Sequence, residues 1–336
     1  MGYTRLFNPP EDPPSDLDDR GYRLGDQYGF ADQQEQASYV YEESIVLAVN
    51  VALATGRPLL IAGEPGTGKS SLARDVARRL KWRFYSKTIS SRTQARDLLW
   101  TFDTIRRLSD AQVRKGVRHP SAYVEPGVLW WAFDTNSAEL RGLKPERFKE
   151  LEEGVQKLTR ATYETMNPDA RRAVVLIDEI DKADPDVPND LLEPLGSFRF
   201  RVIEGELDAL VKASQAPLVF ITTNDERDLP KAFLRRCLAL TLKAPAQPRL
   251  LEIASAHFRH DLADANGQVP LHKAVAEEYF KVRTQLTERK TTPPSTAEYL
   301  DAVSACRELG LTPAAPDWAD EWPKISAATL TKRREN

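Results

Sequence analysis

The residues from Gly63 to Ser70 could hold a phosphate chain. They read GEPGTGKS and fit the pattern G-x-x-x-x-G-K-[ST]. Glycines let a loop bend around phosphates with its backbone N–H groups turned inward. A lysine can then reach the β- and γ-phosphates, and a serine hydroxyl can ligate Mg²⁺. We predict a nucleoside triphosphate site formed by Gly63, Glu64, Pro65, Gly66, Thr67, Gly68, Lys69, Ser70 and Ser71, with Ser70 as a magnesium ligand.

The segments on either side of this loop have the patterns that the motif requires. The apolar run 58–62 is typical of a buried parallel strand. After the loop, Leu72, Val76 and Leu80 recur at helical spacing, with arginines on the opposite side. The alternative is a chance glycine-rich turn before a surface helix, and both flanks count against it.

Two acids follow the apolar run 173–177 and could complete a hydrolytic site. Ligands collect at the carboxyl ends of parallel strands in open α/β folds. Asp178 is suited to holding Mg²⁺, mostly through water, and Glu179 to polarising the attacking water. Many surface strands end in acids, so Asp178 and Glu179 indicate a hydrolytic site only because a phosphate loop lies upstream of them.

Further along the chain, Asn224 and an arginine pair add polar groups. Asn224 ends the apolar run 216–223, where its amide could contact a γ-phosphate or the attacking water. Alternatively, it only terminates the strand, as asparagine commonly does. Arg235 and Arg236 close a short helical segment, and arginines in such places are usually solvated or salt-bridged.

Composition describes an ordinary globular protein of 336 residues, with 41% apolar and 29% charged residues. A net charge of −3 counts against a protein that mainly coats nucleic acid. No apolar run approaches the ~20 residues of a membrane span, and the first residues lack the apolar core of a signal peptide. Because Cys237 and Cys306 are the only cysteines, we expect reduced thiols and a cytoplasmic protein.

The pattern along the chain predicts an α/β fold: a parallel sheet of about five strands with helices on both faces, followed by a small all-helical lid. The predicted parts are a Pro/Asp-rich arm (1–38), a nucleotide-binding α/β domain (39–245), the lid (246–310) and a frayed tail (311–336). Aromatic residues in the arm favour packing on its own core or on a neighbouring subunit, with a mobile tail as the alternative. Trp130 and Trp131 are expected in the core.

The order of phosphate loop, Leu-Ile-Asp-Glu, Thr-Thr-Asn and Arg-Arg resembles the AAA+ ATPases, and within them most closely the MoxR-type branch. The resemblance spans about 39–310 and includes a Glu-Pro-Gly sequence at 125–127 and an expected hairpin at 198–207. It implies that 63–70 is Walker A, that Asp178 and Glu179 are Walker B, and that Asn224 is sensor 1. It also implies an arginine finger, Arg236 or alternatively Arg235, and catalytic roles for Lys69, Glu179, Asn224 and Arg236.

One stretch departs from the family pattern. Many MoxR relatives carry Gly-Ala-Ser-Pro-Arg-Ala in the lid, where the arginine serves as sensor 2. The comparable residues here, 292–298, read TPPSTAE and contain no arginine. No sensor-2 residue is therefore assigned.

The resemblance implies Mg²⁺-dependent ATP hydrolysis by a homo-oligomeric ring, a hexamer, that remodels a protein client together with a von Willebrand A-domain partner. ATP is favoured over GTP by the resemblance and because no Asn-Lys-x-Asp sequence is present. One alternative is a signalling or scaffolding switch that acts while ATP-bound and turns over slowly. A nucleic-acid motor or loader ranks last, since no helix-turn-helix or zinc module is apparent.

Overall fold

The computed structural model describes residues 4–9, 39–113, 116–151, 154–158, 170–258 and 270–331. The chain divides into two compact units. Among the described residues, the first takes in 4–9, 43–62, 73–113, 116–151, 154–158 and 170–241, and the second takes in 39–42, 63–72, 242–258 and 270–331. The phosphate loop thus belongs, by its contacts, to the same unit as the C-terminal helices.

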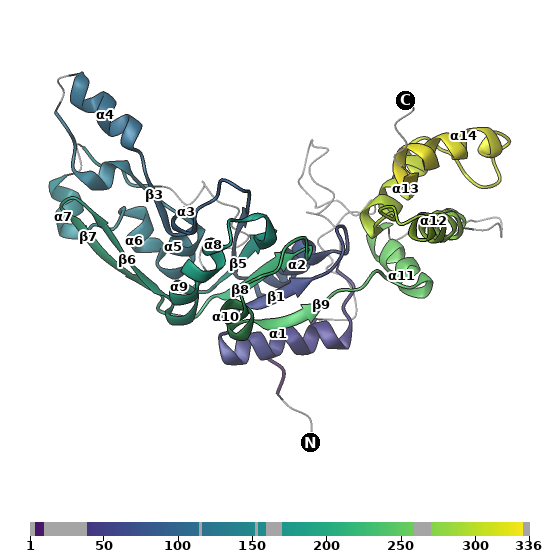
Figure 1. Ribbon diagram of the computed structural model, residues 1–336, viewed down its shortest axis with the longest axis horizontal. Coiled ribbons are helices and arrows are strands. Elements are labelled where there is room, and N and C mark those ends of the chain that lie inside the picture. Colours follow the sequence, from purple (N-terminus) through teal and green to yellow (C-terminus); the bar gives the residue numbers. More distant parts are fainter. Residues whose placement is uncertain are drawn as a thin grey trace. The chain divides into compact units, whose positions relative to one another are not determined.

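A five-stranded parallel sheet forms the centre of the first unit (Figure 1). Its order is β2 (Arg83–Thr88), β5 (Ala173–Asp178), β8 (Leu218–Thr223), β1 (Leu59–Ala62) and β9 (Leu238–Thr241). All neighbouring strands pair in parallel, so their carboxyl ends meet at one edge. With helices covering the sheet and a helical C-terminal region, this confirms the predicted fold class.

Apolar side chains are buried on both faces of the sheet. On one face, Tyr85 and Val175 join the large core cluster that includes Trp130 and Trp131 of α5 (Val128–Phe133). On the other face, Phe84 is fully buried, and the guanidinium of Arg74 stacks on its ring at 5.2 Å. Arg74 belongs to α2 (Lys69–Leu80), so that helix covers this face. The two adjacent tryptophans are core residues, as predicted.

Residues 4–9 pack against α1 (Glu43–Thr55). The side chain of Asn50 accepts hydrogen bonds from the backbone N–H groups of Leu6 (2.6 Å) and Phe7 (2.8 Å). It also donates to the Phe7 carbonyl at 2.7 Å, and the Phe7 ring is buried. These residues therefore pack on their own chain, while residues 10–38 of the predicted arm lie outside the described residues.

The first unit also contains two antiparallel pairs. β3 (Trp100–Phe102) pairs with β4 (Val124–Pro126), and α4 (Thr104–Gln112) lies between them in the sequence. β6 (Arg199–Glu204) pairs with β7 (Leu207–Lys212). The predicted hairpin at 198–207 was wrong in extent, because residues 205–206 form the turn and the second strand only begins at Leu207.

Short helices complete the first unit. They are α3 (Ala95–Leu99), η2 (Pro120–Tyr123), α6 (Thr135–Glu139), α7 (Pro145–Glu150), η4 (Ile180–Lys182), α8 (Asp186–Asp190), α9 (Leu192–Ser197) and α10 (Lys231–Arg236). None of the helices in the described part of the chain is long and apolar enough to cross a bilayer.

The second unit contains α11 (Gln247–Phe258), α12 (Leu271–Glu288), α13 (Thr296–Glu308), α14 (Trp318–Ser326) and a short π-helix, η5 (Ala327–Thr331). The prediction of a frayed tail was wrong for residues 311–331. Trp322 and Leu330 are buried in the core that these helices share, and the rings of Trp318 and Trp322 stack with centroids 5.1 Å apart. The helical spacing of the two tryptophans favours a packed helix. This signal is stronger than that of the prolines, which suggested a frayed tail.

Candidate active site

The phosphate loop leads from β1 into the first turn of α2. Gly66 and Gly68 have φ values of 73° and 86°, in the left-handed region that glycine adopts without strain. A Cβ on Gly66 would lie 2.4 Å from Ser295 Oγ, and one on Gly63 would lie 2.4 Å from the Leu242 carbonyl oxygen. The loop keeps this course only with glycine at these positions, because Ser295 and the Leu242 carbonyl fill the space that a side chain would need.

Lys69 lies within the curve of this loop. Its side chain is buried, and Nζ donates to the carbonyls of Gly63 at 2.7 Å and Glu64 at 3.0 Å. Thr67 Oγ1 donates to the same Glu64 carbonyl at 2.8 Å. Ser70 follows in the first turn of α2, at the positive end of the helix dipole. An ammonium group beside a helix N-terminus favours a bound anion such as a phosphate chain.

An arginine of α12 contacts the loop, and the sequence pattern did not reveal it. Arg283 donates to Glu64 Oε2 and to the Pro294 carbonyl, each at 2.7 Å. The resemblance to MoxR-type proteins places a lid arginine in the stretch comparable to 292–298, whereas Arg283 lies one helix earlier. The sequence offered one signal for Arg283. It follows the buried Tyr279 by four residues, and that spacing places both side chains on one helix face.

The acids that end β5 are joined to β8 through the fully buried Thr222. Its hydroxyl donates to Asp178 Oδ1 and accepts from the Glu179 backbone N–H at 2.8 Å. Glu179 has a φ of 60°, which is uncommon for a residue other than glycine and recurs at functional sites. One hydroxyl thus fixes both predicted Walker B residues at the carboxyl edge of the sheet.

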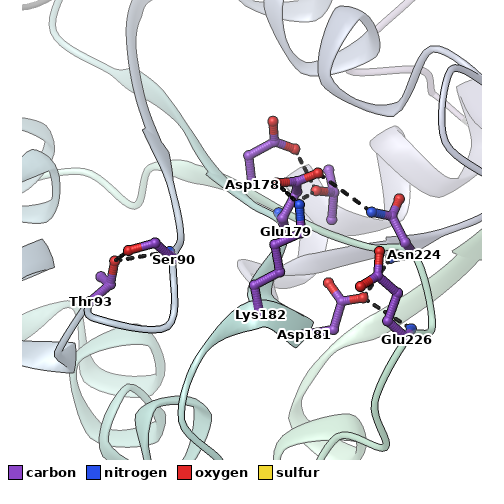
Figure 2. A network of polar contacts seen from close by, with 9 residues as sticks. Ser90, Thr93, Asp178, Glu179, Asp181, Lys182, Asn224 and Glu226 are labelled. Carbon is purple, nitrogen blue, oxygen red and sulfur yellow. Dashed lines mark hydrogen bonds and ion pairs between the residues drawn. The ribbon is translucent and has the colours of Figure 1, made fainter.

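Figure 2 shows the side-chain network around Glu179. Asn224 Nδ2 lies 3.5 Å from Glu179 Oε1, so the structure brings these two predicted residues together. Lys182 Nζ donates to Glu179 Oε2 at 2.7 Å. The buried Asp181 accepts from the backbone N–H groups of Asn224 (3.0 Å) and Glu226 (3.1 Å). Asp181 and Lys182 were not predicted from the sequence.

Arg235 and Arg236 end α10, outside this network. The guanidinium of Arg57 donates to their backbone carbonyls at 2.5 and 3.2 Å and to that of Cys237 at 2.9 Å. This satisfies the last carbonyls of the helix and fixes its end. Both arginine side chains are exposed and have no partner among the residues that the structure describes.

The predicted magnesium ligands suit that ion. The Ser70 hydroxyl and the Asp178 carboxylate are hard oxygen donors, the type that Mg²⁺ prefers. Thr222 holds the Asp178 carboxylate in a fixed orientation, as the partner of a metal ligand commonly does. Their chemistry therefore fits Mg²⁺.

A glycine-rich loop after one strand of a parallel sheet, with acids ending a strand two places away, is the arrangement of P-loop nucleoside triphosphatases. The family model of the AAA domain, dynein-related subfamily, matches residues 58–237, more than half of the chain. The chain therefore belongs to the AAA family. No curated protein sequence matches it. Membership supports nucleotide binding and ATP hydrolysis in general, while the MoxR branch stays a hypothesis.

Proposed function

We propose that this protein is a Mg²⁺-dependent ATPase of MoxR type that works as a homo-oligomeric ring and remodels or activates a partner protein. The contact between Glu179 and Asn224 at the carboxyl edge of the sheet carries the proposal. A carboxylate beside an amide at this edge suits the orientation and polarisation of a water molecule. AAA-family membership supplies the matching nucleotide chemistry.

Each predicted site residue has a proposed role. Lys69 and the loop 63–71 bind the phosphates, while Ser70 and Asp178 hold the metal. When bound, Mg²⁺ neutralises charge on the phosphate oxygens. Glu179 takes a proton from the attacking water, and Asn224 orients that water.

The ring, proposed as a hexamer, is supported by the exposed arginines at the end of α10. A guanidinium that completes a neighbour's site would stabilise charge in the transition state and make hydrolysis depend on assembly. Arg236 is our proposed finger, with Arg235 as the alternative. The protein client and the von Willebrand A-domain partner rest on the MoxR resemblance.

We also retain three expectations as proposals: a nucleotide-binding domain at 39–245, a lid at 246–310, and a cytoplasmic location. Cys237 and Cys306 are buried free thiols. Burial raises the pKa of each to about 11, so both stay protonated at neutral pH. Inert thiols of this kind agree with the expected reduced state.

A second candidate, an ATP-bound switch with slow turnover, is favoured by one observation. Lys182 Nζ donates to Glu179 Oε2 at 2.7 Å. This hydrogen bond engages one of the two oxygens of the carboxylate that must act on water. Slow hydrolysis with tight nucleotide binding would support this candidate over a motor.

Substitution of Glu179 by Gln tests the proposed chemistry. The amide keeps the shape but cannot take a proton, so we expect phosphate release to fall about 100-fold or more while a fluorescent ATP analogue still binds. Asp190→Asn is the matched control, because Asp190 is an exposed acid that ends α8. Hydrolysis at the wild-type rate in Glu179→Gln would refute the assigned role.

A further inference from the structure

The two carboxylate oxygens of Glu179 have partners of unequal strength. Oε2 accepts from Lys182 Nζ at 2.7 Å, a short hydrogen bond assisted by charge. Oε1 lies 3.5 Å from Asn224 Nδ2, at the outer limit of hydrogen bonding. The orientation of the carboxylate is therefore set mainly by the lysine.

The backbone aims Lys182 at this carboxylate. Glu179 precedes the 3₁₀ turn η4, and the Lys182 N–H donates to the Glu179 carbonyl at 3.0 Å. Residues three apart lie above one another in a 3₁₀ turn, so the side chains of Glu179 and Lys182 meet. Asp181, between them, is 2% exposed and anchors the turn to the backbone of Asn224 and Glu226 (Figure 2).

The surrounding charges keep the lysine protonated. The hydrogen bond to Glu179 raises the pKa of Lys182 above its usual value, and the charges of Glu226 and Asp181 act in the same direction. The ammonium thus persists at physiological pH. Because the pair is partly exposed, at 40% for Lys182 and 29% for Glu179, dissolved salt can still weaken it.

We propose that Lys182 is a positioning residue that restrains Glu179 and slows ATP hydrolysis. Its ammonium occupies one acceptor position of Oε2 and fixes the carboxylate, and this contact must open before the carboxylate can turn toward the attacking water. The inference rests on the proposed role of Glu179. On this proposal, basal turnover is slow, and its structural cause lies in the 3₁₀ turn after the acid pair.

Lys182→Met tests this restraint, because methionine keeps an unbranched side chain and removes the charge. We expect kcat to rise roughly three- to tenfold, with little change in KM for ATP. The wild-type rate should also increase with ionic strength more than the variant's rate does. Both proteins are assayed at saturating protein concentration, so that assembly does not limit either rate.

Three variants make the result specific. Lys182→Arg keeps a cation within reach of Glu179 and should behave like the wild type. Lys324→Met removes another lysine–glutamate pair of the same spacing, Lys324 to Glu321 at 2.7 Å in α14, and should leave kcat unchanged. Adding Lys182→Met to Glu179→Gln should give no gain.

A folded Lys182→Met protein that hydrolyses ATP at or below the wild-type rate would overturn the restraint. A gain that persists in the Glu179→Gln background would overturn it as well, because the lysine would then act on something else. Failure of the proposed function is a separate outcome, seen when Glu179→Gln alone keeps full hydrolysis.

Discussion

Thr222 connects two strands at the point where the chemistry is proposed. Its buried hydroxyl serves the side chain of Asp178 and the backbone of Glu179 at the same time. A single oxygen–hydrogen group thereby couples the proposed metal ligand to the proposed base. Any loss of this group leaves a carboxylate oxygen and an N–H without the partners they now have.

Thr222→Val removes the hydroxyl with almost no change in shape. Since buried polar groups without partners are costly, we expect the first unit to lose about 1–3 kcal/mol of unfolding free energy and hydrolysis to slow. Urea unfolding and phosphate release measure the two effects. Thr284→Val, at an exposed position of α12, is the control. Unchanged stability and rate would show that the hydroxyl is dispensable.

At this scale, residue types allowed prediction of Asp178, Glu179 and Asn224, because each follows an apolar strand and strand ends gather at one edge of a sheet. Asp181 and Lys182 could not be predicted in the same way. Their roles depend on a 3₁₀ turn and on contacts with a loop some forty residues later. A local sequence pattern contains neither fact.

Among the elements, α12 and the phosphate loop share the ion pair between Arg283 and Glu64. The glutamate belongs to the loop proposed to bind phosphates, where a negative charge is unfavourable. The guanidinium, whose side chain is only 18% exposed, offsets that charge and also binds the carbonyl before Ser295. The helix therefore tunes the electrostatic potential of the loop.

Arg283→Ala should leave the Glu64 charge uncompensated and weaken ATP binding about two- to fivefold at low salt. Adding Glu64→Gln should recover most of the loss, because it removes the repelling charge. Fluorescence titration with a nucleotide analogue measures both. Arg289→Ala, at the exposed end of the same helix, is the control. Equal affinities in all variants would contradict this role.

Element types were predictable where an apolar run or a helical period was clear, as in β1, β5 and β8 and in the C-terminal helices, whereas β9 was not predicted as a strand. The end of the hairpin and the helical structure of the tail were not predicted. The turn at 205–206 has a local signal in Gly205, whose φ is 60°, but the extent of the hairpin was read too short. The burial of Trp322 depends on which surface its helix packs against, which local propensity does not specify.

For the whole molecule, the proposed site shared between subunits would make hydrolysis a property of the assembly. If Arg236 acts on a neighbouring subunit, ATPase activity per protomer should rise with protein concentration. Arg236→Ala should abolish that rise while nucleotide still binds. Sizing in ATP and in ADP follows assembly. Arg235→Ala decides between the two candidate fingers, because the rise should persist in this variant if Arg236 is the finger and disappear if Arg235 is.

Mixing gives a sharper version of the same test. Arg236→Ala retains Glu179, and Glu179→Gln retains Arg236, so mixed rings contain some complete sites. Two variants that are each inactive should recover part of the activity together. A mixture that stays inactive, or a rate that is independent of concentration, would contradict a finger supplied by a neighbour.

The close approach of Gly66 to Ser295 has a consequence for how this protein can evolve. The loop residue has no room for a Cβ, and the residue opposite it begins α13 through a capping box with Glu298. A larger residue at either position would disturb the other. The two sites, far apart in the sequence, therefore restrict each other's substitutions, and drift in the lid is limited by the geometry of the loop.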